Sequence, residues 1–188
     1  YEIDHLIHSF AVMQKSLKEY IKNLEITNAE KNRILAEVQV ASEIQRKLIP
    51  ANTEHPYKVK EIRCYGILEP AGEIGGDLYD FFPVDESHFF FVIADVAGKG
   101  IVASMTMIMV STYLRTISTY NFTVNEIMKN LNNFLCTQSS AAIFVTALIG
   151  IIDLKNDELE FSNAGHTPLF LRKLNGTMKF SPILIPIL

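Results

Sequence analysis

Residues 1–49 carry apolar side chains in alternating steps of three and four, and this spacing predicts one long amphipathic helix. Eleven of the fourteen positions in the series are apolar. The series is Ile3, Leu6, Phe10, Met13, Leu17, Tyr20, Leu24, Thr27, Lys31, Ile34, Val38, Ala41, Gln45 and Leu48. A sustained repeat of about 3.5 residues is typical of a coiled-coil seam, so we expect a homodimer through residues 3–48. The alternative is a helix packed on its own domain, and Pro50 ends the helix in either case.

After Pro50 the apolar pattern predicts short strands and two helices. We expect strands over 61–69, 78–84, 88–96, 144–152, 158–162, 169–174 and 177–180, and helices over 101–120 and 123–136. The apolar run 89–94 predicts a central strand buried on both faces. Asn156-Asp157 and Asn175-Gly176 mark hairpin turns, and strands joined by hairpins are antiparallel. This order predicts an α+β fold, an antiparallel β-sandwich flanked by helices.

Charge divides the chain into the same two regions. The 188 residues include 17 Lys and Arg and 21 Asp and Glu, for a net charge of −4. Residues 1–49 hold seven basic and seven acidic side chains, so the negative charge lies downstream and nucleic acid is not an expected partner.

No apolar run reaches the ~18 residues of a membrane span. Cys64 and Cys136 lack the spacing of a metal knuckle or redox pair, and we expect a reducing, cytoplasmic setting.

Two aspartates stand beside glycines at predicted strand ends. Asp77 follows Gly75 and Gly76, and Asp95 ends the apolar run shortly before Gly98. A carboxylate in such a place leaves water at a cost unless it is hydrogen-bonded or held by a cation. Carboxylate and carbonyl oxygens suit Mg²⁺ or Mn²⁺, so these residues are candidate metal ligands. Taken alone, the same features are equally compatible with two aspartates that only cap turns.

Other common motifs fail on spacing. Gly98-Lys99 does not belong to a Walker A loop, because position 93 is Ile and position 100 is Gly. Gly72, Gly75 and Gly76 do not fit the dinucleotide-binding pattern, and neither H-E-x-x-H nor G-x-S-x-G occurs. These counts disfavour a nucleotide-binding, kinase-like protein.

Several motifs in residues 41–188 follow one another in a recognisable order. They are Glu43-Ile44-Gln45 with Leu48-Ile49-Pro50, the segments 70–82 and 94–104, Phe144-Val145-Thr146, and Asn163-Ala164-Gly165-His166-Thr167-Pro168. Their order and spacing closely resemble the SpoIIE/RsbU subgroup of the PPM-type metal-dependent serine/threonine phosphatases. The resemblance implies an enzyme, a hydrolase that removes phosphate from phosphoserine or phosphothreonine in a protein. Substrates in this subgroup are typically anti-anti-sigma proteins of the STAS type.

The resemblance also assigns roles to residues. Asp77 and Asp95 would be catalytic and hold two Mn²⁺ or Mg²⁺ ions, with the Val96 backbone carbonyl as a further ligand. A hydroxide held between the metals would attack the phosphorus. The residues that would line the site are Gly76, Gly98, Lys99, Asn163 and His166, with His166 donating a proton to the leaving oxygen. Two readings compete with this: a tight turn at 163–166, and a solvated loop charge at Lys99.

The resemblance bears on domain organisation as well. Residues 2–13 resemble the second helix of a HAMP signalling module, which implies a membrane sensor upstream of this cytosolic portion. We expect two domains, a signalling helix over 1–49 and a phosphatase domain over 50–188. The family pattern continues with a strand and late aspartates that complete the metal pair, so this chain is expected to lack the C-terminal strands. The alternative function is therefore a catalytically incomplete coiled-coil dimer module that binds a signalling partner.

Overall fold

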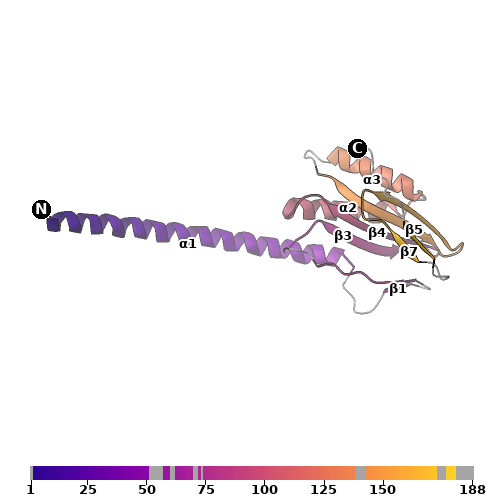
Figure 1. Cartoon of the computed structure of the whole chain (residues 1–188), viewed down its shortest axis with the longest axis horizontal. Helices are drawn as coiled ribbons and strands as arrows, with labels where there is room; N and C mark the ends of the chain where they lie inside the picture. Colours follow the sequence, from indigo (N-terminus) through magenta and orange to yellow (C-terminus); the bar gives the residue numbers. More distant parts are fainter. Residues whose placement is uncertain are drawn as a thin grey trace. The chain divides into compact units, whose positions relative to one another are not determined.

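The chain divides into two compact units, residues 1–41 and residues 42–188. The computed structural model describes residues 2–50, 57–59, 62–69, 72, 74–138, 143–172 and 177–180 (Figure 1). Its elements, in chain order, are one long helix, four short or medium strands, two helices and four further strands. Among the described residues, no helix combines the length and apolarity needed to cross a bilayer.

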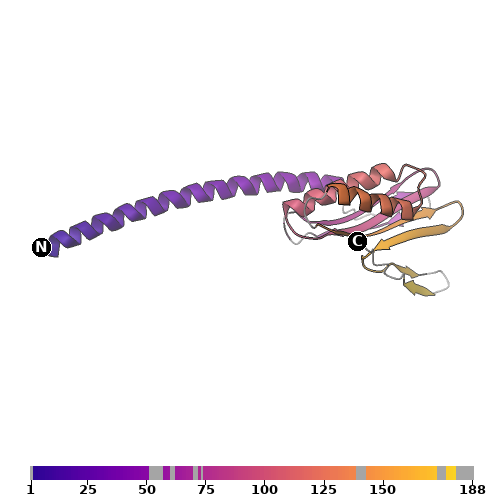
Figure 2. The same ribbon diagram turned by 90° about the horizontal axis from the view of Figure 1, so that it is seen from above.

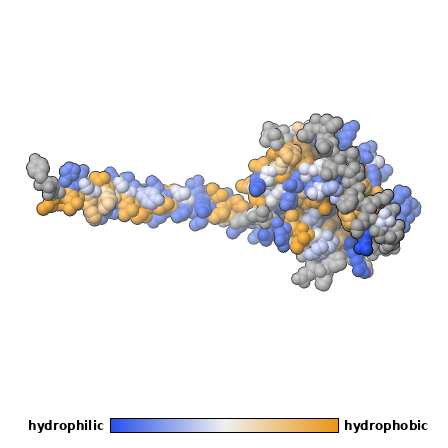
Figure 3. Space-filling view, in the orientation of Figure 1, coloured by the Kyte–Doolittle hydropathy of each residue, from blue (hydrophilic) through white to orange (hydrophobic). Residues whose placement is uncertain are grey.

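The long helix α1 spans Glu2–Leu48 without interruption, as the sequence predicts. The segment contains neither Gly nor Pro, so nothing in it opposes helix propagation. Along residues 2–41 the apolar stripe is exposed to solvent, and Figure 3 shows apolar side chains along much of the helix. Leu6 is 71% exposed, Leu17 56% and Ile34 52%. Dimerisation through this stripe remains a prediction.

The last turns of α1 belong to the second unit and depart from the predicted seam. Gln45, which the repeat places in the seam, is only 4% exposed. Ser42 is also buried, and Ile49 packs against the hydrophobic core. Gln45 and Ser42 therefore face their own domain, whereas Leu48, the next seam position, is 37% exposed.

The second unit is built on a four-stranded antiparallel sheet with the order β3-β4-β5-β6. The strands are β3 (Asp77–Pro83), β4 (His88–Val96), β5 (Val145–Asp153) and β6 (Glu158–Ala164). Short turns join β3 to β4 and β5 to β6, which makes each pair antiparallel. Between β4 and β5 the chain forms α2 (Ile101–Ile117) and α3 (Val124–Gln138), which cover one face of the sheet (Figures 1 and 2).

The hydrophobic core lies between this sheet face and the two helices. Alternate residues of β4 point into it, because successive side chains of a strand face opposite ways. Each fully buried apolar side chain contributes about 1.5–3 kcal/mol. The α3 helix begins with a capping box, in which the Glu126 carboxylate accepts the Thr123 N–H at 2.9 Å. The central core residues are Phe90, Val92, Ala94, Val96, Met107, Val110, Leu114, Ile127, Leu131 and Ile149.

The opposite face of the sheet is more open than the sequence predicts. The strand β4 is central, as expected, but Ile93 on this face is 49% exposed. The expectation of burial on both faces holds at Phe89, which is 1% exposed, and fails at Ile93, because the helices cover only one face. On the open face the Phe91 ring occupies the space that a side chain at Gly150 would need.

Two short antiparallel ladders complete the described structure. β1 (Tyr57–Val59) pairs with β2 (Ile62–Cys64), and β7 (Phe170–Arg172) pairs with β8 (Met178–Phe180). The predicted strand 61–69 is too long, since residues 65–69 are not in a strand, and β1 was not predicted. The Asn175-Gly176 hairpin falls outside the described residues. The α+β class, with antiparallel sheet and flanking helices, is confirmed.

Candidate active site

Asp77 and Asp95 are direct cross-strand partners on β3 and β4. The same register continues to β5, where Thr146 is the partner of Asp95. Residues directly opposite one another in a sheet share a face, so these three polar side chains form one row across the open face. Both aspartates are exposed. Like charges in directly opposed positions destabilise a sheet, so this pair has a cost that a bound cation would remove.

His166 is held beside this row by two side chains. Its Nδ1 lies 3.0 Å from the Thr146 hydroxyl. The Asn163 amide fixes the backbone around it, because Asn163 Oδ1 accepts the His166 N–H at 2.8 Å. Asn163 Nδ2 donates to the carbonyl oxygens of His166 and Thr167 at 3.2 and 3.3 Å. Asn163 therefore stabilises the turn, and His166 is the member of this motif that interacts with the aspartates.

The charges of these groups act on one another. Burial, the charge of Asp95 and a hydrogen bond to Asp95 raise the pKa of the Asp77 carboxyl, and His166 opposes the rise. Burial lowers the pKa of the His166 imidazole, against the attraction of Asp95 and Asp77. His166 is thus close enough to both carboxylates for their fields to reach it, which links the three groups in one electrostatic cluster.

Gly76 brings the two strands together at the same point. Its carbonyl oxygen accepts the Val96 N–H at 3.3 Å. A Cβ at position 76 would lie 2.8 Å from the Val96 carbonyl oxygen, so a larger residue there would press against that oxygen. Val96 follows Asp95 directly, and its carbonyl is therefore an additional oxygen donor next to the aspartate pair.

The residues of this cluster fit a hard divalent cation. Two carboxylates and the Val96 carbonyl are all oxygen donors, the kind that Mg²⁺ and Mn²⁺ prefer. Within the described part of the chain, no group of three His, Cys, Asp or Glu side chains is spaced to hold a metal. The fit therefore rests on the aspartate pair and the neighbouring Val96 carbonyl.

Two other predicted site residues lie in the loop after β4. Gly98 and Gly100 have φ angles of 107° and 75°, a left-handed conformation that glycine adopts without strain. Lys99 between them is exposed. This loop turns the chain into α2, and no contact places Gly98 or Lys99 in the aspartate cluster.

Three residues support the site through contacts that the sequence did not predict. Thr146 belongs to the Phe144-Val145-Thr146 motif, but only the register of β5 reveals that it links Asp95 to His166. Gln45 Nε2 donates to the Gly75 carbonyl at 2.6 Å, two residues before Asp77. Asp80 is buried on the helix-covered face of β3 and forms an ion pair with Arg115. None of these contacts has a local sequence signal.

A solved structure shares the fold of this chain. The SiaA-PP2C domain of Pseudomonas aeruginosa matches with a TM-score of 0.60 at 18% identity, over 76% of this chain and 57% of that one. At this identity the likeness shows the fold, which is that of a PP2C-type phosphatase domain. The fold class predicted from the sequence agrees with it.

The chain belongs to the SpoIIE family. The family described as Stage II sporulation protein E (SpoIIE) matches residues 85–183, more than half of the sequence. The Synechocystis protein IcfG is 27% identical over 202 residues, covering 93% of this chain and 31% of IcfG. Phosphoserine phosphatase RsbU of Bacillus subtilis is 28% identical over 137 residues, covering 73% of this chain and 40% of RsbU. The chain thus spans well under half the length of these two curated relatives. Membership of the SpoIIE family, as predicted, is confirmed, while the HAMP resemblance remains a prediction.

Proposed function

We propose that this chain is the phosphatase portion of a signalling protein and hydrolyses phosphoserine or phosphothreonine in a regulatory phosphoprotein. Asp77 and Asp95 hold one or two Mn²⁺ or Mg²⁺ ions, with the Val96 carbonyl as a further ligand. The observation that carries the proposal is the pairing of these two carboxylates across β3 and β4, with His166 in their field. Such a pair has no stabilising role in a sheet, which favours a functional one.

The chain's own residues have distinct roles in this proposal. A bound divalent cation would neutralise charge on the phosphoryl oxygens and lower the pKa of the attacking water. His166 lies beside the carboxylates and donates a proton to the leaving seryl or threonyl oxygen. As the imidazolium that donates the proton, His166 carries hydrogen on both ring nitrogens, so Nδ1 donates to the Thr146 hydroxyl and Nε2 is the nitrogen left to face the substrate. Thr146 and Asn163 are positioning residues.

The substrate class follows from the exposure of the site and from the family. Asp77 and Asp95 are exposed on a sheet face, so a phosphorylated side chain on a protein surface can reach them without a deep pocket. RsbU, a relative, is named a phosphoserine phosphatase. By that resemblance the substrate is an anti-anti-sigma protein of the STAS type, and the reaction takes place in the cytoplasm.

Control of the site by α1 is part of the proposal. The Gln45 side-chain amide donates to the Gly75 carbonyl and accepts the Gly75 N–H, at 2.6 and 3.3 Å. A shift of the end of α1 would therefore move the segment that carries Asp77. The exposed stripe on residues 3–41 pairs with a second copy, and a membrane sensor preceding the chain would act through this dimeric helix.

The activity is tested by phosphate release from an aryl phosphate and from a phosphoserine protein of the STAS type, with added Mn²⁺. We expect Asp95→Asn to reduce the rate at least about 100-fold, because it removes one of two ligand carboxylates. Asp157→Asn is the matched control, since Asp157 is exposed in the β5–β6 turn and Asn tolerates its φ of 55°. Equal rates for the Asp95→Asn protein and the unaltered chain would overturn the assignment.

Dimerisation needs a separate test. Single cysteines are placed at Leu17 and at Val38 in a Cys136→Ser background, because Cys136 is exposed and would crosslink by itself. Disulfide crosslinking at both positions is the expected result, and its absence at both would reject the dimer.

The alternative function, a non-catalytic module that binds a partner, is favoured by the lack of a third ligating side chain among the described residues. It predicts a dimer that releases no phosphate.

A further inference from the structure

Asp77 begins β3, the strand at one edge of the described four-stranded sheet. Its partner Asp95 lies on β4, which pairs with a strand on either side. An edge strand has no neighbouring strand on its outer side to fix its backbone. The start of β3 therefore needs other contacts if Asp77 is to keep a fixed place opposite Asp95.

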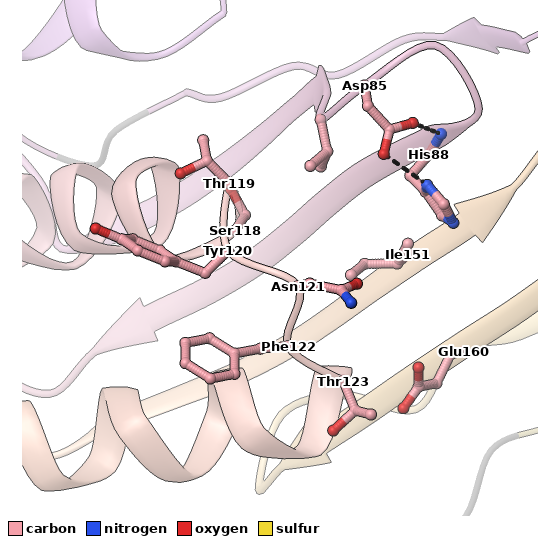
Figure 4. Close-up of a pocket in the computed structure, with 11 residues that line it drawn as sticks. Asp85, His88, Ser118, Thr119, Tyr120, Asn121, Phe122, Thr123, Ile151 and Glu160 are labelled. Atoms are coloured by element: carbon pink, nitrogen blue, oxygen red, sulfur yellow. Dashed lines mark hydrogen bonds and ion pairs between the residues drawn. The ribbon is translucent and has the colours of Figure 1, made fainter.

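The other end of the β3–β4 hairpin is fixed by contacts within the turn. The Asp85 carboxylate accepts the N–H groups of Ser87 and His88 at 2.7 and 2.8 Å. Its second oxygen lies 2.7 Å from His88 Nδ1 (Figure 4). The Val84 N–H donates to the His88 carbonyl at 2.9 Å and closes the hairpin. All these partners are close in sequence, so the turn end of the hairpin is held locally.

The end that carries Asp77 is held by segments far away in the sequence, and Tyr79 contacts two of them. The Tyr79 hydroxyl lies 2.9 Å from the Pro50 carbonyl oxygen and 3.0 Å from the Gly66 carbonyl oxygen, and it donates its one proton to this pair. Pro50 follows the end of α1, and Gly66 follows β2. One side chain of β3 therefore reaches both segments.

The Tyr79 ring is closely packed as well. A Cβ at position 66 would lie 2.7 Å from Cδ2 and 2.8 Å from Cζ of the ring, so a larger residue there would displace it. The ring also stacks on Phe81, with the two centroids 6.0 Å apart. Tyr79 is 8% exposed, whereas its cross-strand partner Ile93 is 49% exposed. These contacts bury the Tyr79 side chain where its neighbour in the sheet is half exposed.

Two contacts with the end of α1 bracket Asp77. The Gln45 side chain is hydrogen-bonded to Gly75, two residues before Asp77, at 2.6 and 3.3 Å. Tyr79, two residues after Asp77, is hydrogen-bonded to Pro50. Because side chains two residues apart on a strand share a face, Tyr79 lies on the same side of β3 as the aspartate. The backbone on each side of Asp77 is thus tied to the same helix end.

We propose that Tyr79 is a positioning residue, which keeps Asp77 opposite Asp95 by anchoring β3 to the end of α1 and to Gly66. The inference rests on the proposed function, in which Asp77 is a ligand of a divalent cation. Tyr79 acts through the backbone of β3 and supplies no ligand. Loss of its hydroxyl leaves the ring packed but lets the start of β3 move, which weakens the site while both carboxylates stay in the chain.

The first test compares Mn²⁺ binding by the full chain and by its Tyr79→Phe variant, which keeps the ring and removes the hydroxyl. The electron paramagnetic resonance signal of unbound Mn²⁺ gives the affinity without any measurement of activity. We expect Tyr79→Phe to weaken Mn²⁺ binding roughly three- to ten-fold, less than the ~10–100-fold loss typical for a direct partner of a metal ligand. Tyr65→Phe is the matched control, because Tyr65 is 63% exposed, and it should leave the affinity unchanged.

Hydrogen exchange followed by NMR supplies a second readout, measured without metal. The Val96 N–H donates to the Gly76 carbonyl at 3.3 Å, so its exchange rate reports on the residue next to Asp77. In Tyr79→Phe this rate should rise about two- to ten-fold, the effect of one lost hydrogen bond. The Val84 N–H at the turn end should exchange as before, and Tyr65→Phe should change neither rate.

Each outcome decides for or against the role of Tyr79. An unchanged Val96 exchange rate in Tyr79→Phe would overturn the inference. So would an equal rise at Val84, because the substitution would then loosen the whole domain. Unchanged Mn²⁺ affinity would also overturn it, provided that Asp77→Asn lowers that affinity. If Asp77→Asn itself has no effect on Mn²⁺ binding, the proposed metal site is wrong, and the Val96 exchange rate alone decides whether Tyr79 holds this segment.

Discussion

Arg115 of α2 holds the buried carboxylate of Asp80 with two hydrogen bonds. Arg115 Nε donates to Asp80 Oδ2 at 2.7 Å, and Nη2 donates to Oδ1 at 2.8 Å. Asp80 is 2% exposed, and the Arg115 guanidinium lies 4.7 Å from the centroid of the Phe82 ring. Burial raises the pKa of Asp80, and the hydrogen bond and charge of Arg115 oppose the rise. The pair therefore joins α2 to β3, the strand on which Asp77 lies three residues earlier.

Removal of Arg115 should destabilise the domain. The Arg115→Met chain leaves the buried Asp80 without its charge partner, which costs ~3–5 kcal/mol when both members are buried. Arg115 is half exposed, so we expect about 2–3 kcal/mol in the free energy of unfolding. Urea denaturation followed by circular dichroism measures it. Arg115→Lys should fall in between, because Lys keeps the charge but not the paired geometry. No change in Arg115→Met would show that Asp80 needs no partner.

Gly76→Ala should disturb the aspartate pair through the backbone. The added methyl group would lie 2.8 Å from the Val96 carbonyl oxygen and 3.3 Å from Ala103 Cβ, so one of the strands must shift. Overpacking of this kind costs about 1–3 kcal/mol, and we expect a lower midpoint of thermal unfolding together with loss of phosphate release. Gly72→Ala is the control, because its Cβ would meet only the Ile74 carbonyl at 3.9 Å. Equal effects of the two substitutions would contradict the close-approach argument.

Elements with a strong local pattern were predictable, whereas contacts between distant segments were not. The sequence predicts β4 with the observed bounds, because six consecutive apolar residues between polar ones allow little else. The capping box of Thr123 and Glu126 was predictable for the same reason, since both partners lie within one turn. The stretch 61–69 was mispredicted because β-forming residues alone do not ensure that a segment pairs with another strand. Among the described residues of this stretch, only those of β2 pair with a strand, β1.

The candidate site shows the same division. Glycines next to Asp77 and Asp95 pointed to both residues, and the structure pairs them. Thr146 and Arg115 went unnoticed because each acts on a residue 20 or 35 positions away, a separation at which periodicity carries no information. Gln45 is one of the polar positions in the predicted coiled-coil seam. Its actual partner is the backbone of Gly75, and no sequence pattern distinguishes the two environments.

Asp85 gives a prediction about pH. Hydrogen bonds from the Ser87 N–H and from His88 lower the pKa of the Asp85 carboxyl in the folded state. The ionised Asp85 therefore contributes fully to the stability of the fold above the unfolded pKa of about 3.9. That contribution is lost as the pH falls below this value. Asp85→Asn should therefore lower the free energy of unfolding at pH 7 by at most about 1 kcal/mol, because the group is exposed. The difference from the unaltered chain should shrink steadily below pH 4. Unfolding by urea across this pH range measures it, and a difference that persists undiminished at pH 2.5 would contradict the assigned cause.

The hydrogen bond between Thr146 and His166 should matter for turnover more than for folding. Thr146→Val keeps the shape of the side chain but removes the hydroxyl that lies 3.0 Å from His166 Nδ1. If that hydroxyl fixes the imidazole for proton donation, kcat for phosphate release should fall roughly ten-fold. This loss is a part of the ~10²–10⁴-fold rate enhancement that general acid catalysis supplies. Thr146→Ser retains the hydroxyl and should retain most of the rate. The midpoint of thermal unfolding should change little in either variant. A Thr146→Val chain with unaltered kcat would show that His166 needs no such support, whereas equal losses in the Ser and Val variants would implicate the methyl group and packing instead.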